Sequence, residues 1–96
     1  MIRFEWDPAK ARRKLAKHGV SFGDAKRVFD DPFALMLQDR IEHGEERWQA
    51  IGRARPHRVL VVAHTARHAT GVDIIRIISA RRALRHERQR YEDQAY

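Results

Sequence analysis

The sequence predicts an α+β domain in which an antiparallel sheet packs on a helical hairpin and a last helix ends the chain. Two observations predict this class. A short alternating strand is followed by two amphipathic helical segments, and these are followed by four strand-like segments with short connections. The expected order is therefore β-α-α-β-β-β-β-α. The 96 residues suffice for a single domain, which we expect to extend over residues 1–96.

The N-terminal strand and the first helix are marked by alternation and by capping residues. Apolar and polar residues alternate over 2–6, which is typical of a half-buried strand. Asp7 and Pro8 then supply an N-cap and a proline at the first helical position. We therefore expect a helix over 8–18, ended by Gly19 as a left-handed C-cap residue.

A second helix follows almost at once. Ser21 is a suitable N-cap, and the helix should stop before Pro32 because the residue preceding a proline resists the helical conformation. Its apolar stripe consists of Phe22, Ala25, Val28 and Phe29. Since the loop between the two helices is very short, we expect them to pack as a helical hairpin that covers one face of the sheet.

The rest of the chain has the pattern of four strands and a helix. Strands are expected at 33–38, 47–52, 58–65 and 72–79, with polar loops at 39–44 and 66–71 and a turn at 53–57. Short connections imply an antiparallel meander. The last helix is expected at about 80–91, with Ser79 as a possible N-cap. The sheet face away from the helical hairpin would remain open to solvent or ligand.

The composition indicates a basic protein that binds anions. The formal charge is +7 and the pI is near 10.8, with arginine the main source of positive charge. Such a charge favours nucleic acid or an acidic protein partner, although a solvated basic surface is the simpler explanation. Cysteine is absent, no apolar run approaches the roughly 20 residues of a membrane span, and the N-terminus lacks a secretory signal. These features fit a cytoplasmic location.

Five segments, in order along nearly the whole chain, resemble the BrnT family of toxins. They are FEWDPAK at 4–10, KHGVSF at 17–22 with VFDDP at 28–32, GEERWQAIG at 44–52, VVAHT at 61–65, and IRIISARRA at 75–83. The resemblance implies a RelE-like fold and a ribonuclease that cuts RNA and so halts translation. It also implies a BrnA antitoxin of ribbon-helix-helix type that neutralises the toxin, so that operator DNA is contacted only through the antitoxin.

RNA cleavage without a metal uses the ribose 2′-hydroxyl as the nucleophile. It requires a base near that hydroxyl, an acid near the leaving 5′-oxygen, and positive charge at the phosphoryl oxygens. His64 and His68 fall in a strand and a loop rather than on one helical face, so a zinc site is not expected. We expect a metal-independent enzyme without a cofactor.

Arg76 is the first candidate catalytic residue because it interrupts an isoleucine-rich central strand. A charge at such a position is costly unless it is paired or faces a ligand. Our hypothesis is that Arg76 binds the scissile phosphate. The alternative is a structural ion pair with Asp73, Glu45 or Glu46.

His64, Arg47 and Glu46 complete the central candidates. His64 ends a central strand and titrates near neutral pH, so it could carry the proton, although a histidine packed at the edge of the core is nearly as plausible. Arg47 is the candidate for phosphate stabilisation. Glu46 could be a base or a surface partner for arginine, and since neighbouring strand residues point to opposite faces, only one of Glu46 and Arg47 can face the open side.

Four more basic residues are candidates at the ends of helices. Arg81 and Arg82 are expected to begin the last helix, where the macrodipole disfavours cations. Their presence there suggests either a functional reason or simple tolerance at a solvated helix end. We place Arg81 at the phosphate, and Arg82 and Arg85 among RNA-binding residues. Lys17, at the end of the first helix, is a further RNA-binding candidate.

The leading hypothesis is therefore an endoribonuclease toxin that binds RNA across the open sheet face. Two alternatives remain at this stage. One is a non-catalytic module that binds RNA or the ribosome. The other is a protein whose basic surface serves only an acidic partner.

Overall fold

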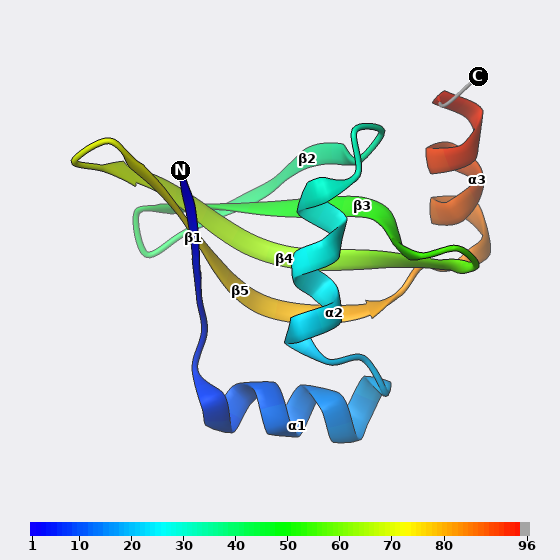
Figure 1. Cartoon of the computed structure of the whole chain (residues 1–96), viewed down its shortest axis with the longest axis horizontal. Coiled ribbons are helices and arrows are strands. Elements are labelled where there is room, and N and C mark those ends of the chain that lie inside the picture. Colours follow the sequence, from blue (N-terminus) through cyan, green and yellow to red (C-terminus); the bar gives the residue numbers. More distant parts are fainter. Residues whose placement is uncertain (95–96) are drawn as a thin grey trace.

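A computed structural model describes residues 1–94, and the last two positions of the expected domain, 95 and 96, lie outside the described residues. The predicted α+β class and the order β-α-α-β-β-β-β-α are confirmed. The elements are β1 (Ile2–Glu5), α1 (Pro8–His18), α2 (Phe22–Lys26), a 3₁₀ turn η1 (Arg27–Asp30), β2 (Leu35–Glu42), β3 (Glu45–Arg55), β4 (Arg58–Ala69), β5 (Val72–Arg82) and α3 (Arg85–Gln94). Figure 1 shows how they are arranged.

The five strands form one sheet in the order β1-β5-β4-β3-β2. The predicted antiparallel meander is confirmed for β2 to β5. The prediction of a fully antiparallel sheet was wrong, because β1 lies parallel to β5 at the edge. The segment with α1 and α2 connects β1 at one edge of the sheet to β2 at the other edge, and the meander β2 to β5 then returns to β1. A parallel pair such as β1 and β5 requires a long connection of this kind.

The first helix begins and ends at the predicted residues. The Asp7 side chain accepts hydrogen bonds from the backbone N–H groups of Ala9 and Lys10, and Gly19 adopts φ 70° as the C-cap. Ser21 caps α2 by accepting from the Asp24 N–H. The predicted helical hairpin was wrong: α1 and α2 lie crosswise in Figure 1, and both pack on β5. The α2 helix buries Phe22 and Ala25 against the sheet, whereas α1 contacts the sheet without a fully buried residue.

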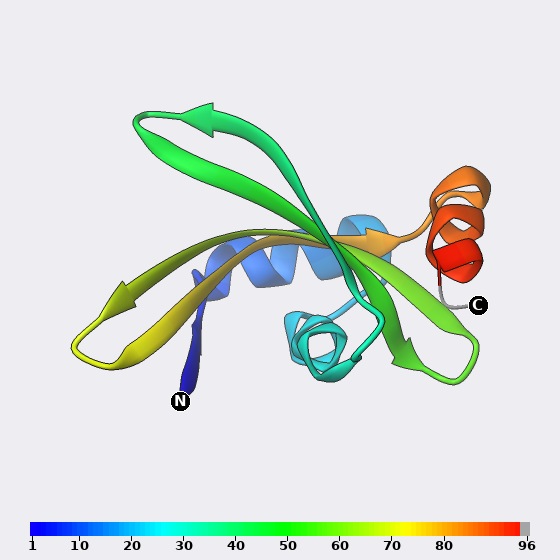
Figure 2. The ribbon, with the colours of Figure 1, turned by 90° about the horizontal axis from the view of Figure 1, so that it is seen from above.

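The hairpin strands are longer than predicted, and their turns are shorter. The expected loops at 39–44 and 66–71 are mostly strand, and the turns are His43-Gly44 and Thr70-Gly71. All four turn residues have positive φ, as a two-residue turn that matches strand twist requires. These strand ends are polar because they project into solvent. In Figure 2 the β2–β3 hairpin and the β4–β5 hairpin diverge at the end away from α3.

The last helix begins later than predicted. Residues 80–82 continue β5, because Ala80, Arg81 and Arg82 pair with β4, and α3 begins at Arg85. The proposed N-cap at Ser79 was therefore wrong, and so was the expectation that Arg81 and Arg82 begin a helix. Both arginines precede the helix, and the Arg81 guanidinium pairs with Glu87 in the first turn of α3.

Two apolar clusters lie on the two faces of the sheet. The larger one packs α2 and η1 on β3, β4 and β5, through residues such as Phe22, Val28, Leu60 and Ile77. Its fit is close at Gly52, where a Cβ would lie 2.8 Å from a Val28 methyl group. The smaller cluster, on the opposite face, joins Tyr91 of α3 to Ile51, Val59 and Val61. Within residues 1–94 no helix is long and apolar enough to cross a membrane.

Candidate active site

The face of the sheet opposite α1 and α2 is covered by α3 at one end only, and we call the remainder the open face. Strand alternation and register place one set of side chains there. Across the strands it presents Arg40 of β2, Arg47 of β3, Thr65 of β4 and Arg76 of β5, which we call the basic row. Three arginines thus share one face close to Trp48 and His64, the last β3–β4 pair.

Arg76 lies on this face, and its side chain is 49% exposed. Its Nη1 atom is 3.7 Å from Oε1 of Glu5, the residue beside it on parallel strand β1. The expected ion-pair partner Asp73 instead contacts His68, at 2.8 Å. Arg76 therefore has an acidic neighbour that the sequence did not suggest, but half of its side chain remains accessible to a ligand.

Arg47 is half-buried and lies two strands away from Arg76. Thr65 is paired with Arg76, and Arg47 is next to the last β3–β4 pair, Trp48 with His64. Strands in a sheet lie about 4.8 Å apart, so the Cα atoms of Arg47 and Arg76 are separated by roughly 10 Å across Thr65. The Nε atom of Arg47 is buried and has no hydrogen-bond partner within residues 1–94. A buried unpaired donor is costly, so the Arg47 guanidinium is incompletely satisfied within the fold, although the inaccessible Nε atom does not itself offer a ligand contact in this conformation.

His64 lies on the opposite side of the sheet from the two arginines. Its ring packs edge-on against Phe29 at 4.9 Å between centroids, and its Nδ1 atom lies 3.2 Å from the carbonyl oxygen of Val62. Only 3% of the residue is exposed. Burial lowers its pKa, against a smaller opposite effect of the Val62 hydrogen bond. The structure therefore does not bring His64 together with Arg47 and Arg76.

Glu46 and Arg47 point to opposite faces, as strand alternation requires. Glu46 is exposed near the β2–β3 turn, where it pairs in register with Ile41. By alternation Glu46 lies on the same side of the sheet as Trp48 and His64, which is the side of α1 and α2. Arg47 is thus the member of this pair that faces the open side.

Arg81 lies on the same side of the sheet as Arg76, but at the end that α3 covers, and it is bound by another side chain. Its Nη1 and Nη2 atoms donate to the two carboxylate oxygens of Glu87 at 2.7 and 2.9 Å. Glu87 also accepts from the backbone N–H of Leu84 at the start of α3. The bond from Arg81 is the main reason that the pKa of Glu87 is lowered, with burial acting against it. Arg81 therefore fastens α3 to β5, and it lies far along the strand from Arg76.

The three RNA-binding candidates lie apart from the basic row. Arg82 is exposed beside the β3–β4 turn, in a pocket that it lines with Arg55, Arg58 and Arg88. Arg85 is exposed at the first position of α3. Lys17 is exposed in the last turn of α1, which packs on the other side of the sheet. The structure brings none of them to Arg47 and Arg76.

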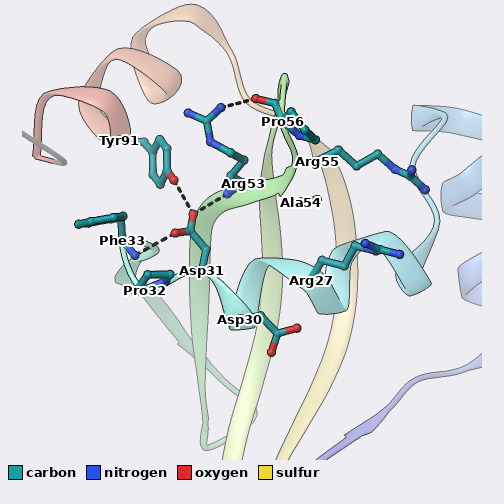
Figure 3. Close-up of a pocket in the computed structure, with 10 residues that line it drawn as sticks. All are labelled: Arg27, Asp30, Asp31, Pro32, Phe33, Arg53, Ala54, Arg55, Pro56 and Tyr91. Atoms are coloured by element: carbon teal, nitrogen blue, oxygen red, sulfur yellow. Dashed lines mark hydrogen bonds between the residues drawn. The ribbon is translucent and has the colours of Figure 1, made fainter.

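Another pocket lies where η1, β3 and α3 meet (Figure 3). The Asp31 carboxylate accepts hydrogen bonds from the N–H groups of Phe33 and Arg53, at 2.9 and 2.8 Å, and from the hydroxyl of Tyr91. Burial raises the pKa of Asp31, but the bonds from Tyr91 and the two N–H groups outweigh it, and the pKa lies below its usual value. We interpret this group of contacts as a structural junction, because the carboxylate is already satisfied by the protein.

The sequence did not identify Glu5, Thr65 and Arg67 as site residues. Glu5 accepts from Arg67 at 3.3 Å as well as approaching Arg76, so it joins arginines from β4 and β5. Alternation along β1 could have placed Glu5 on the same side as Arg3. Its neighbours depend on the β1–β5 pairing, which is a long-range contact.

No group of three or more His, Asp or Glu side chains positioned to hold a metal ion occurs in the described part of the chain. The basic row carries arginine, which binds phosphate oxygens in a planar, two-pronged geometry.

Comparison with known proteins identifies a family and a similar solved structure. The family model described as "Ribonuclease toxin, BrnT, of type II toxin-antitoxin system" matches residues 6–87. The crystal structure of the Brucella abortus ribonuclease toxin BrnT is similar in fold, with a TM-score of 0.67 and 22% sequence identity over 88% of this chain and 100% of that chain. No curated protein matches the chain significantly. At this identity the structural likeness concerns the fold, while the family model concerns the sequence.

Proposed function

This chain belongs to the BrnT family of ribonuclease toxins of type II toxin–antitoxin systems, and from that premise we propose that it is an endoribonuclease that cuts RNA on its open face. The family implies an RNA substrate and an antitoxin partner. The observation that supports the site is the placement of Arg47 and Arg76 on the same uncovered face, with Arg47 Nε lacking an internal partner.

The proposed reaction is a metal-independent transesterification. The 2′-oxygen attacks the adjacent phosphorus, and the 5′-oxygen leaves. Negative charge grows on the phosphoryl oxygens as the reaction proceeds, and pre-positioned guanidinium groups stabilise it. In this mechanism Arg47 and Arg76 hold the scissile phosphate from two sides. Arg81 has a structural role through Glu87.

The biological setting follows from the family and from charge. We propose that cleavage of mRNA or ribosome-associated RNA halts translation in the cytoplasm. We also propose that a BrnA-like ribbon-helix-helix antitoxin neutralises the enzyme and makes the contact with operator DNA. The net charge of +7 supports attraction to RNA and to an acidic segment of such a partner.

The test is RNA cleavage by the purified protein in the presence of EDTA. We expect defined cuts that leave a 2′,3′-cyclic phosphate and a 5′-hydroxyl. Arg76→Ala and Arg47→Ala should each lower the single-turnover rate by about 10²–10³-fold, the usual loss for one charge-stabilising donor. Arg13→Ala, which removes an exposed arginine of α1, is the matched control and should cleave at the wild-type rate.

Three outcomes would contradict the proposal. Binding of RNA without any cut would indicate a non-catalytic module, and the absence of RNA affinity would indicate a surface that serves only a protein partner. Cleavage that persists unchanged in both arginine variants would remove the proposed site. In cells, induced expression should arrest growth, and co-expression of the adjacent antitoxin gene should restore it.

A further inference from the structure

Glu5 is the acidic side chain that forms an ion pair with Arg76 of the proposed phosphate site. It ends β1, next to Arg76 in the parallel β1–β5 register, while the preceding Phe4 points to the helical side and packs against Phe29. Its Oε1 atom is 3.7 Å from Nη1 of Arg76 and 3.3 Å from Nη2 of Arg67. The carboxylate is 34% exposed, so a substrate can reach it.

The distances place this carboxylate within reach of a ribose. A phosphoryl oxygen bound by a guanidinium lies about 2.8 Å from the nitrogen. If Arg76 holds the scissile phosphate in this way, that oxygen lies roughly 4–6 Å from Oε1 of Glu5. The 2′-oxygen is carried by the ribose carbon next to the one whose 3′-oxygen bears the same phosphorus, so it can come within hydrogen-bond distance of the carboxylate. Among the ion pairs within residues 1–94, the pair with Glu5 is the one that involves an arginine assigned to the phosphate.

We propose that Glu5 is the general base of the reaction, an inference that rests on the proposed function. The carboxylate takes the proton of the 2′-hydroxyl as the bond from the 2′-oxygen to phosphorus forms and the bond from phosphorus to the 5′-oxygen breaks. The leaving 5′-oxygen takes a proton from water at the exposed face. Glu5 later returns its proton to solvent, so nothing is oxidised or reduced.

The base must be ionised to act, so the cleavage rate should fall on the acidic side as Glu5 gains a proton. The charged groups that face Glu5 are Arg76 from β5, Arg67 from β4 and Arg3 from its own strand. All three are cations that remain charged throughout the accessible pH range. The acidic limb of the rate profile therefore reports the carboxylate.

A purely structural role for Glu5 predicts something different. If Glu5 only orients Arg76, its loss weakens RNA binding, and the shape of the pH profile is unchanged. Two measurements separate the roles: the dissociation constant for RNA with a 2′-deoxy nucleotide at the scissile position, and the single-turnover cleavage rate between pH 4 and pH 8.

The experiment uses Glu5→Gln, which has nearly the same shape and keeps one oxygen for the arginines. We expect the rate to fall by about 10²–10⁴-fold, the acidic limb to disappear, and the dissociation constant to stay within about threefold of wild type. Glu5→Asp keeps a carboxylate on a shorter side chain and should retain the acidic limb at a reduced rate. Glu92→Gln, which removes a carboxylate paired with Arg88 on α3, is the matched control and should behave as wild type.

Glu5→Gln that cleaves at the wild-type rate, or that keeps the acidic limb, overturns the inference. So does a loss of RNA affinity that accounts for the whole loss of rate. If the wild-type protein itself does not cut RNA, the proposed function fails and the inference with it. An active wild type with an equally active Glu5→Gln variant removes the inference alone.

Discussion

His64 could serve as a proton carrier or as a packed side chain of the core, and its position in the structure favours the second role. It packs against Phe29 on the helical side, and burial lowers its pKa, so that the neutral ring is favoured at pH 7. A proton carrier must reach the ribose or the leaving oxygen. From its place under the helices, His64 cannot reach an RNA bound by Arg47 and Arg76 without the sheet opening.

We therefore predict that His64→Gln lowers stability but not chemistry. Loss of the buried ring and of its contact with Phe29 should cost about 1–3 kcal/mol in the free energy of unfolding, measured by urea denaturation. The single-turnover cleavage rate of the folded variant should stay within about threefold of wild type, since 0.65 kcal/mol corresponds to about threefold. A loss of more than 100-fold at unchanged stability would instead make His64 the proton carrier.

At the scale of single residues, the sequence shows which side chains are unusual for their position but not which side chains lie next to each other in the folded protein. Arg76 was recognisable because a charge in an isoleucine-rich strand is anomalous, and the structure places it on the open face. Glu5 has no such anomaly, since an acid in an edge strand is ordinary. Its importance arises from register with Arg76, which depends on a pairing between residues about 70 positions apart.

At the scale of elements, α3 is attached to the sheet by two polar junctions and one buried aromatic ring. Glu87 holds Arg81, and Tyr91 inserts its ring into the smaller apolar cluster while its hydroxyl donates to Asp31. The position of this helix limits the open face, because it covers the end of the sheet around Ile51 and Val61. The junction at Asp31 should therefore matter for stability, in a pH-dependent way.

The prediction concerns Asp31→Asn. Because the folded-state pKa of Asp31 lies below its unfolded value of 3.8, the ionised group stabilises the fold above that value, and this stabilisation is lost as the pH falls through the folded pKa. At pH 7 the variant should be about 1–2 kcal/mol less stable than wild type in urea denaturation. The difference should shrink below about pH 4.

Asp30→Asn is the control for this prediction, because Asp30 is exposed and points away from the Asp31 contacts in Figure 3. Its stability difference from wild type should be small and should not change with pH in the same way. A difference for Asp31→Asn that stays constant from pH 7 to pH 3 would show that the ionised carboxylate does not contribute through this junction.

Element boundaries were predictable where local signals decide them and wrong where pairing decides them. Asp7, Pro8 and Gly19 fix both ends of α1 without help from the rest of the chain. Residues 80–82 have good helix-forming composition, but pairing with Leu60, Val61 and Val62 keeps them in β5. The crosswise packing of α1 and α2 and the parallel β1 are likewise consequences of tertiary contacts that local sequence does not encode.

At the scale of the whole molecule, the positive charge is distributed unevenly between paired and available arginines. Arg55 and Arg58 are turned toward Asp24, Arg81 toward Glu87, and Arg88 toward Glu92. Within the basic row, Arg40 is paired with Glu42 at 2.9 Å. On much of the surface, therefore, fewer arginines are free to bind an anionic ligand than the net charge suggests. The open face keeps Arg47 without an acidic partner among the described ion pairs, together with a half-exposed Arg76.

This distribution predicts how RNA binding depends on salt. For a single strand, the logarithm of affinity falls with the logarithm of salt concentration with a slope of about −0.7 per phosphate contact. If Arg40 exchanges Glu42 for a phosphate, so that the basic row makes three contacts through Arg40, Arg47 and Arg76, the slope is about −2, and affinity should fall roughly twentyfold between 50 and 200 mM KCl. The measurement is fluorescence anisotropy with the 2′-deoxy RNA, which cannot be cut.

The arginine variants show whether the contacts are those of the basic row. Arg76→Ala should make the slope less steep by about 0.7, because one phosphate contact is lost. Arg13→Ala removes the same charge from α1 and should leave the slope unchanged, since Arg13 lies outside the open face. If the two variants changed the slope equally, RNA would be attracted by net charge alone and not by a built surface. A slope that changes only with Arg76 shows that a few guanidinium groups held by strand register, and not the overall excess of +7, determine where RNA binds.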